Sequence, residues 1–386
     1  MKQIQVIGAV IVLLASWAAA GTPKVKMVRV PDGGIQPQVA VDQEGTVHLL
    51  YYKGPEGGGD LFYAKSTDGG SSWSAPIRVN SQPRSAMSIG TIRGGHLAVG
   101  KNGRVHVAWM GADGALPKPA GTKATPMLYA RMNDQGTAFE PQKNVISEKV
   151  GLDGGGSVAA DRLGNVYVAW HAPPRPNAGE ENRTVWIARS KDEGKTFEPE
   201  TKAWQEPTGA CGCCGMRIFA DASGRTYILY RSAREMVHRD IYLLSSKNGQ
   251  EFSGKKVGPW EIGQCVMSSA SFAQARSGAL AAWESQNQVY WARASASDGD
   301  VGEGISPTGR GRNRKHPVVA ENLAGQVILA WTEETGWNKG GKLAWQVFDV
   351  EGKPLENTFG KADGVPVWSL PAAFTAPDGS GFVIMY

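Results

Sequence analysis

One unit recurs seven times along the sequence: an apolar strand, a short turn that usually contains glycine, and a second apolar strand. Examples are PQVAVDQEGTVHLLYY from Pro37, SVAADRLGNVYVAWH from Ser157 and AFTAPDGSGFVIMY at the C-terminus. The period is roughly fifty residues, which is typical of propeller blades and too long for the coils of a β-helix. The 50 glycines among 386 residues agree with a turn-rich, all-β fold.

A third strand follows most of these hairpins, as in DLFYAKS, TVWIARS and DIYLLSS, and a fourth strand often follows the third. Four-stranded sheets repeated radially form a β-propeller, which protects the sheet edges by closure. The last hairpin has no third strand after it, and KVKMVRV at positions 24–30 resembles the fourth strand of the first unit. We therefore predict that the N-terminal strand completes the last blade. Seven hairpins favour seven blades, and six is the alternative if one hairpin is not a true inner pair.

The first 20 residues have the features of an export signal. Lys2 precedes an apolar segment at positions 7–14, and the three alanines that end at Ala20 fit a small-x-small cleavage site. This segment is too short for a comfortable membrane span. We predict cleavage near Ala20, a secreted or periplasmic protein without a membrane span in the mature chain, and one propeller domain over residues 21–386. An uncleaved anchor helix is the alternative.

The charge distribution argues against nucleic acid as a partner. The formal net charge is +5, and the one dense basic stretch is RGRNRK at positions 310–315. Nucleic-acid-binding domains carry larger basic patches, so we expect no such partner.

The turns after the third strands share a second pattern, S-x-D-x-G-x-[ST]-[WF]. In such a turn the Asp side chain accepts hydrogen bonds from backbone N–H groups, the Gly takes a positive φ, and the aromatic side chain packs beneath. The pattern is complete in two turns, with Ser66, Asp68, Gly70 and Trp73 in one and Ser190, Asp192, Gly194 and Phe197 in the other. It is partial in two more turns, with Asp134, Gly136 and Phe139 in one and Ser245, Gly249 and Phe252 in the other.

This pattern resembles the Asp box, or BNR repeat, of the sialidase superfamily, and the resemblance covers essentially the whole mature chain as architecture. It implies a sialidase-like propeller in which these turns lie far from the active site. Sialidases bind the substrate carboxylate with three arginines, the first of them in an R-I-P motif that leads into the first blade. Here GGIQPQVAV has Gln36 where that arginine is expected. We therefore do not expect true exo-sialidase activity; if the protein is an enzyme, the resemblance implies glycoside-hydrolase-like chemistry.

Propeller loops alternate between two faces, and ligands usually bind on the face whose loops lead into the first strands and join the second strands to the third. We expect an anionic glycan to bind or to be processed there. The candidate acids and bases are His238, Asp240, Glu284 and Glu333, and the candidate ligand-binding residues are Arg217, Arg231, Arg234, Arg239, Arg314, His316 and Trp337. For each charged residue, the alternative is a solvated loop charge or a salt bridge between blades. The repeated tryptophans Trp109, Trp170, Trp283 and Trp331 are expected to pack between blades.

Three of the four cysteines, Cys211, Cys213 and Cys214, lie within four positions, just before the first strand of the fourth unit. Cys265 lies just before the first strand of the fifth unit. Because first strands line the channel of a propeller, all four thiols are expected to meet at its mouth.

Three interpretations of this cysteine cluster remain open. The first is disulfide bonding, which an even number of cysteines in an exported chain supports. The second is a copper or zinc site, because thiolates are ligands of Cu(I) and Zn(II). The third is a reactive thiol with a vicinal disulfide between Cys213 and Cys214. The alternatives to a glycan-directed function are therefore a metal- or thiol-dependent protein and a non-catalytic scaffold with disulfide-stapled loops.

Overall fold

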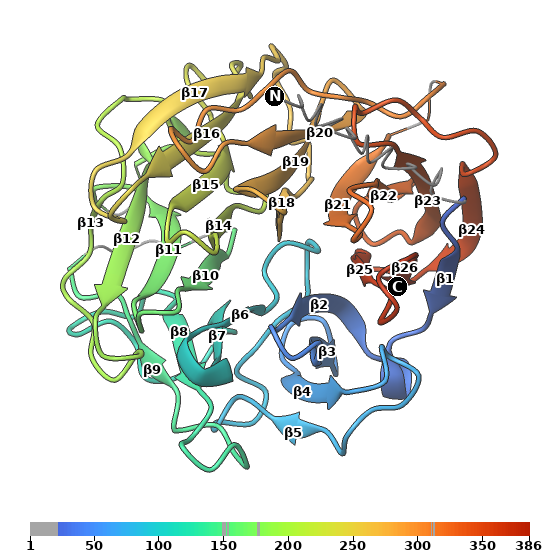
Figure 1. Cartoon of the computed structure of the whole chain (residues 1–386). Coiled ribbons are helices and arrows are strands. Elements are labelled where there is room, and N and C mark those ends of the chain that lie inside the picture. The colour runs from blue at the N-terminus through green and yellow to red at the C-terminus, as the bar shows by residue number, and fades with distance from the viewer. Residues whose placement is uncertain (1–21, 149–151, 153, 176–177, 310, 312) are drawn as a thin grey trace, which may run out of the picture.

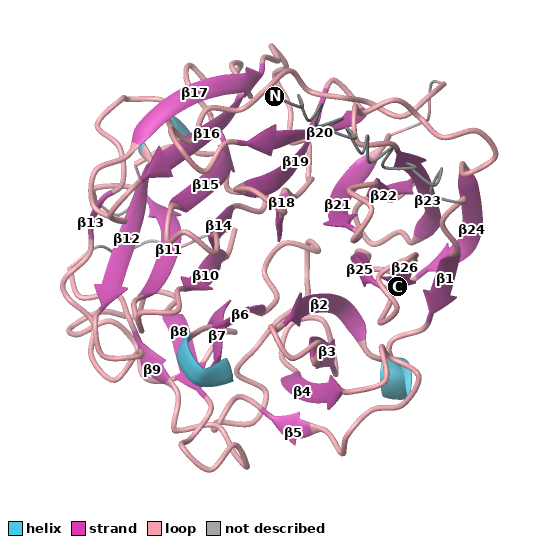
Figure 2. Cartoon of the chain, in the orientation of Figure 1, coloured by secondary structure: helices cyan, strands magenta, loops and turns pink. Residues whose placement is uncertain are grey.

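The computed structural model describes residues 22–148, 152, 154–175, 178–309, 311 and 313–386, so the predicted export signal lies outside the described part. Seven small β-sheets stand around a central axis (Figure 1). The described residues form no α-helix and only three short 3-10 segments, η1 (Pro31–Gly33), η2 (Lys101–Gly103) and η3 (Glu180–Asn182) (Figure 2). None of these helical segments has the length and apolarity that crossing a bilayer requires. The predicted seven-bladed, all-β propeller is confirmed.

Five of the sheets have four strands each, in chain order from the axis outwards. Blade one has β2 (Ile35–Val41), β3 (Val47–Lys53), β4 (Asp60–Ser66) and β5 (Ile77–Arg78), and blade two has β6 (His96–Val99), β7 (Val105–Met110), β8 (Met127–Arg131) and β9 (Lys143–Asn144). Blade three has β10 (Gly156–Ala160), β11 (Val166–Ala172), β12 (Thr184–Ser190) and β13 (Thr201–Lys202), and blade four has β14 (Arg217–Ala220), β15 (Thr226–Arg231), β16 (Ile241–Ser246) and β17 (Ser253–Gly258). Blade six has β21 (Lys315–Glu321), β22 (Val327–Glu333), β23 (Gly341–Phe348) and β24 (Gly360–Val365).

The other two sheets have three strands each. Blade five has β18 (Ser271–Gln274), β19 (Ala279–Ser285) and β20 (Gln288–Ala294), and blade seven has β25 (Ala372–Thr375), β26 (Phe382–Met385) and β1 (Val25–Val28). Strand β1 pairs in parallel with β26, with Val25 opposite Phe382. The N-terminal strand therefore closes the ring as predicted, although it takes the third place of a three-stranded blade.

Each junction between neighbouring blades holds one cluster of buried apolar side chains. Trp109, Trp170, Trp283 and Trp331 belong to four of these clusters and are at most 1% exposed. The prediction that these tryptophans pack between blades is confirmed. Truncating a buried side chain of this size to alanine typically costs about 3–5 kcal/mol, so these junctions are major contributors to the stability of the ring.

The two complete turn motifs have the hydrogen bonds that the sequence predicts. In the turn from Ser66 to Trp73, the N–H of Gly70 donates to Ser66 Oγ at 2.8 Å, and the N–H of Ser72 donates to Asp68 Oδ1 at 2.9 Å. Gly70 has a φ of 80°, and Trp73 packs against the apolar cluster between blades seven and one. The second turn repeats this arrangement with Ser190, Asp192, Gly194, Thr196 and Phe197.

The partial motif of blade two differs from the prediction. Asn133, one position before Asp134, caps the turn by accepting a hydrogen bond from the N–H of Thr137 at 3.0 Å. Asp134 instead forms a salt bridge with Arg104 at 2.5 Å. A capping role for Asp134 is therefore wrong, because the neighbouring amide already occupies the capping position.

The partial motif of blade four is shifted by one residue. Ser246, and not Ser245, bonds to the capping side chain of Asn248 at 2.9 Å. The glycines of both partial motifs have the positive φ that was expected, 68° at Gly136 and 66° at Gly249. Their aromatic side chains, Phe139 and Phe252, also join the clusters between blades.

Candidate functional site

The two ends of the central channel differ in what covers them. We call the end with the turns between first and second strands the hairpin-turn face, and the end with the cysteine loops the cysteine face. At the cysteine face, the loop between β5 and β6 crosses the centre of the ring (Figure 1, cyan). Ile92 of this loop is 3% exposed. A side-chain carbon added to Gly155 of blade three would lie 2.6 Å from the Ile92 carbonyl oxygen. The loop therefore closes the channel at this end.

Gln36 holds this covering loop in place. Its side-chain amide donates to the carbonyl oxygens of Ser88 at 2.8 Å and Trp368 at 2.7 Å, and its backbone N–H donates to Ser369 Oγ at 3.1 Å. These contacts join the loops that lead into blades two and seven. The residue that stands where a sialidase-like chain has its first arginine is thus a neutral, 4% exposed link between loops.

A cavity of about 1210 Å³ opens at the hairpin-turn face. Its rim includes the turns at 42–44, 101–103 and 161–162. Gln38 and Arg217 line this cavity and also a hollow of about 10 Å³ that includes residues of the loops on the cysteine face. These two residues therefore form the layer that divides the channel, and the large cavity lies on the face opposite to the predicted ligand face.

Arg217 is a cation with neutral partners at the inner end of this cavity. Its Nη1 bonds to His96 Nδ1 and its Nη2 donates to Gln38 Oε1. Burial and the Arg217 charge lower the pKa of His96 well below its ordinary value, so His96 is neutral. Burial lowers the pKa of Arg217 to about 10, which leaves the guanidinium charged at neutral pH. No carboxylate is among its partners in the described part of the chain.

The aspartates of the cavity wall are occupied by their own turns. Asp42 bonds to His48 at 3.0 Å, and Asp161 accepts from the backbone N–H of Asn165 at 2.9 Å. Asp221 caps the turn between β14 and β15 in the same way, accepting from the backbone at 2.9 and 3.0 Å. These carboxylates therefore stabilise the hairpin turns of the rim.

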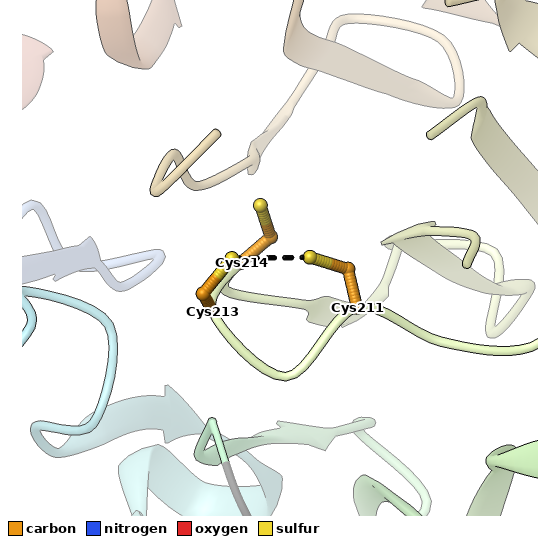
Figure 3. A group of neighbouring side chains, drawn as sticks. All are labelled: Cys211, Cys213 and Cys214. Atoms are coloured by element: carbon orange, nitrogen blue, oxygen red, sulfur yellow. Dashed lines mark hydrogen bonds between the residues drawn. The ribbon is translucent and has the colours of Figure 1, made fainter. Parts of the chain in front are cut away.

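Three of the four cysteines meet at the cysteine face, as Figure 3 shows. The sulfur atoms of Cys211, Cys213 and Cys214 lie within 4.8 Å of one another, and those of Cys211 and Cys213 are 3.2 Å apart. Cys211 and Cys214 are buried and Cys213 is half-buried, whereas Cys265 is exposed and lies outside the group. All four are unpaired thiols. The predicted convergence therefore holds for three thiols and not for Cys265.

Backbone hydrogen bonds fix the loop that carries these three thiols. The N–H of Cys211 donates to the carbonyl of Arg231 at 2.9 Å, and the N–H of Gly215 donates to the carbonyl of Ser268 at 2.9 Å. The N–H of Gly212 donates to Glu180 Oε1 at 2.7 Å. Contacts from blades three, four and five therefore hold the thiols together.

The charges around the cluster favour one thiolate. Burial opposes ionisation of Cys214, but hydrogen bonds from the other two thiols and the charge of Arg231 hold the pKa of Cys214 well below its usual value. The hydrogen bonds with Cys211 and Cys214, together with burial, raise the pKa of Cys213. Lys315 and Arg239 also lie close enough to the sulfur atoms to interact with their charge.

Two of the predicted site residues, Arg231 and Glu284, form a buried ion pair beside the thiols. Arg231 Nη2 donates to Glu284 Oε2 at 2.6 Å, and Nη1 donates to the carbonyl of Arg239 at 2.7 Å. Burial raises the pKa of Glu284 to about 7, although the charge of Arg231 opposes this shift. Both side chains are at most 2% exposed, so the pair links blades four and five and does not face solvent.

Two further predicted arginines are paired in the same way. Arg239 Nη1 donates to Glu180 Oε2 at 2.7 Å. Arg314 Nε donates to Glu333 Oε1 at 3.2 Å, and Lys361 binds the other oxygen of Glu333 at 2.6 Å. Arg239, Arg314 and Glu333 are all at most 3% exposed, so these pairs connect elements of the propeller.

The loop of blade four holds the other predicted acid and base. Asp240 is buried and accepts from the N–H of Trp260 at 2.9 Å and from Lys256 at 2.9 Å. His238 lies 3.5 Å from Glu235 and 3.4 Å from a second exposed glutamate, Glu261. Asp240 is therefore a structural ion-pair partner, whereas His238 is partly accessible.

The remaining predicted residues of this face do not form one site. Arg234 is exposed, and Trp337 is 56% exposed and packs edge-on against Trp368 with ring centroids 4.9 Å apart. His316 is 4% exposed and bonds to Ser269 Oγ at 3.0 Å. Burial and the charge of Lys315 lower the pKa of His316 to about 3, so it is neutral.

Sequence reasoning missed four residues that shape the two ends of the channel: Gln38, His96, Glu180 and Lys315. Gln38 and His96 lie in the innermost strands of blades one and two, as Arg217 does in blade four. A polar residue in the first strand of a blade indicates a position that lines the channel. This pattern is visible in the sequence.

No protein-family model matches the sequence, and no curated protein sequence matches it. Solved structures do match. A protein of unknown function from Dyadobacter fermentans aligns over 81% of this chain and 94% of its own, with a TM-score of 0.55 and 15% identity. The α-L-arabinanase of Penicillium chrysogenum aligns over 84% and 95%, with a TM-score of 0.50 and 16% identity. A NanB sialidase of Streptococcus pneumoniae aligns over 86% and 68%, with a TM-score of 0.51 and 10% identity. The fold-level resemblance to sialidases is therefore confirmed.

Proposed function

We propose that this protein binds an anionic carbohydrate in the cavity of the hairpin-turn face. The observation that carries the proposal is Arg217, a charged side chain with neutral partners at the inner end of that cavity. A guanidinium group matches the two oxygens of a carboxylate. A sugar acid is therefore the ligand class that supplies the counter-charge which Arg217 lacks.

The size and the walls of the cavity suit a chain of a few sugar units. Its volume of about 1210 Å³ is above the range of about 300–1,000 Å³ that is usual for small-molecule sites. The half-buried rings of Phe219 and Phe272 are stacked with centroids 5.7 Å apart and offer apolar surface on one wall. Lys101 and Arg162 add positive charge at the rim.

The structural relatives support carbohydrate as the first ligand class to test. The arabinanase structure is a complex with arabinobiose, and the Streptococcus pneumoniae relative is named a sialidase. The predicted export signal supports a secreted or periplasmic location, where polysaccharides are available as ligands.

We propose binding and not hydrolysis. Most glycoside hydrolases place two carboxyl groups on either side of the scissile bond. In this cavity Asp42, Asp161 and Asp221 are each occupied by hydrogen bonds of their own turn or strand, which leaves Glu44 as the one other carboxylate among the described lining residues. These aspartates stabilise the turns of the rim, and Arg217 is the residue that binds the ligand.

The proposal is tested by titrating the purified protein with oligogalacturonate, chondroitin sulfate fragments and neutral arabino-oligosaccharides in a calorimeter. We expect the acidic sugars alone to bind, with an affinity that falls as salt is added. The variant Arg217→Gln should bind at least about tenfold more weakly, because a charge-assisted hydrogen bond contributes about 1.5–3 kcal/mol. Arg234→Gln, on the cysteine face, is the matched control and should bind like the parent protein.

Two results would overturn the proposal. One is that no acidic sugar binds at millimolar concentration. The other is that binding survives Arg217→Gln but is lost in Trp337→Ala, which would place the ligand on the cysteine face.

A further inference from the structure

We propose that Cys211, Cys213 and Cys214 form a three-coordinate site for one Cu(I) ion. This site is independent of the carbohydrate cavity, which lies at the other end of the channel. The cluster is the one group of three or more Cys, His, Asp and Glu side chains, among the described residues, whose ligand atoms converge in this way.

The number of thiols favours a metal over a disulfide. Any one disulfide within the cluster uses two of the sulfur atoms and leaves the third in a largely buried position without a bonding partner. Cys265 does not supply that partner, because its side chain is exposed and outside the group. A single metal ion, in contrast, uses all three sulfur atoms at once.

The number and type of ligands favour Cu(I) over Zn(II). Structural zinc sites are almost always four-coordinate and tetrahedral. Here three sulfur atoms converge, and the nearby His316 is directed to Ser269 by a hydrogen bond of 3.0 Å. Thiolate-only coordination suits soft Cu(I), which accepts three ligands.

The surroundings supply charge balance and access. Three cations interact with the charges of the sulfur atoms: Arg231, Arg239 and Lys315. When the thiols lose their protons on metal binding, these cations stabilise the negative charge of the thiolates. Cys211 and Cys214 are buried, while Cys213 is half-buried. An ion can therefore reach the two buried thiols through the half-buried thiol of Cys213.

Rigid support is the last requirement of a metal site, because a loose loop gives weak and unselective binding. The loop is tied at Cys211 to Arg231, at Gly212 to Glu180 and at Gly215 to Ser268. The sulfur atoms are therefore gathered before any ion arrives, which lowers the cost of ordering on binding.

The experiment is an anaerobic Cu(I) titration of the reduced full chain against a chromophoric Cu(I) chelator. We expect one Cu(I) per chain and X-ray absorption that shows sulfur ligands only. Cys214→Ser and Cys213→Ser should each weaken Cu(I) binding by more than about 100-fold, because even outer partners of a metal site contribute about 10–100-fold. Cys265→Ser is the matched control and should leave the affinity unchanged.

Misfolding is excluded by comparing the unfolding midpoint of each variant without metal; Cys213→Ser is the milder change because that thiol is half-exposed. Four results would overturn the proposal. Three of them are failure to retain Cu(I) against the chelator, equal loss of binding in Cys265→Ser, and one Zn(II) bound tetrahedrally with no Cu(I) retained. The fourth is a disulfide between two of the three cysteines that persists in mild reductant, with no Cu(I) bound.

Discussion

The two ends of the channel use arginine in opposite ways. Near the cysteine face, Arg231 is paired with Glu284 and Arg239 with Glu180, at 2.6 and 2.7 Å. At the inner end of the hairpin-turn cavity, Arg217 has neutral partners. An arginine that is already paired with a carboxylate stabilises the assembly of blades, whereas an arginine without a carboxylate partner is available to a ligand. Burial and charge alone therefore do not identify a ligand-binding arginine. What identifies it is whether a carboxylate of the protein already neutralises its charge.

The largest effect is expected where the charge is paired. Glu284→Ala leaves the guanidinium of Arg231 buried without its carboxylate, and breaking a buried pair from one side costs about 3–5 kcal/mol. Urea unfolding followed by tryptophan fluorescence measures this loss. Glu235→Ala removes an exposed carboxylate of the same face and should change the free energy of unfolding by less than about 0.5 kcal/mol.

A double variant sharpens this test. Replacing the pair by Arg231→Met with Glu284→Leu should recover much of the lost stability, because well-packed apolar residues often substitute for a buried ion pair without loss. If Glu284→Ala unfolds at the same urea concentration as the parent protein, the pair does not hold blades four and five together.

A second effect, which depends on pH, is expected from acid at the hairpin-turn end. His106 bonds to Tyr129 at 2.7 Å, and burial, with the charges of Arg104 and Arg131, lowers the pKa of His106 to about 3. The unfolded chain binds this proton near pH 6.5, so the stabilisation is complete above pH 6.5 and is lost as the pH falls towards 3. The loss is roughly 1.4 kcal/mol for each pH unit in that window.

His106→Asn removes this titration and keeps a polar group near the Tyr129 hydroxyl. We expect a flatter dependence of the free energy of unfolding on pH between 6.5 and 4 than in the parent protein. Urea unfolding at several pH values measures it. An unchanged slope would mean that other groups, His48 among them, dominate the acid response.

The smallest effect, with the opposite sign, is expected at Arg217. Burial lowers the pKa of this arginine to about 10, so its charge is unfavourable in the folded protein without ligand. Arg217→Met should leave the free energy of unfolding within about 1 kcal/mol of the parent value or raise it. A loss as large as that of Glu284→Ala would show that Arg217 is a structural residue like Arg231.

The sequence was sufficient for the architecture because each blade repeats the same local pattern. The alternation of apolar residues, the turn glycines and the Asp68 and Asp192 caps act within one blade, so a single blade contains the information. Asp134 was misassigned because Asn133, its immediate neighbour, satisfies the same turn. Two adjacent residues of similar chemistry cannot be ranked from spacing alone.

The site was harder to predict because its residues act between blades. In the sequence Arg231 and Arg239 resemble ligand-binding arginines, but in the structure each is paired with a glutamate of a neighbouring blade. That pairing depends on how the blades are placed. The positions of the cysteine side chains also could not be predicted from the sequence alone. Their order along the chain predicted four thiols at one mouth, but the side chain of Cys265 is exposed and lies outside the cluster.

The parallel pairing of β1 with β26 also has a consequence for biosynthesis. A ribosome makes residues 25–28 long before residues 382–385, yet these two segments share a ladder. The ring therefore stays open until β26 has been made, and the edge of β1 is exposed until then. Closing a ladder over so long a stretch of chain is slow, so the newly made protein has a long interval in which a chaperone can act. A product that stops short of Phe382 leaves β1 without its neighbour, which gives proteases a direct way to distinguish incomplete chains from finished ones.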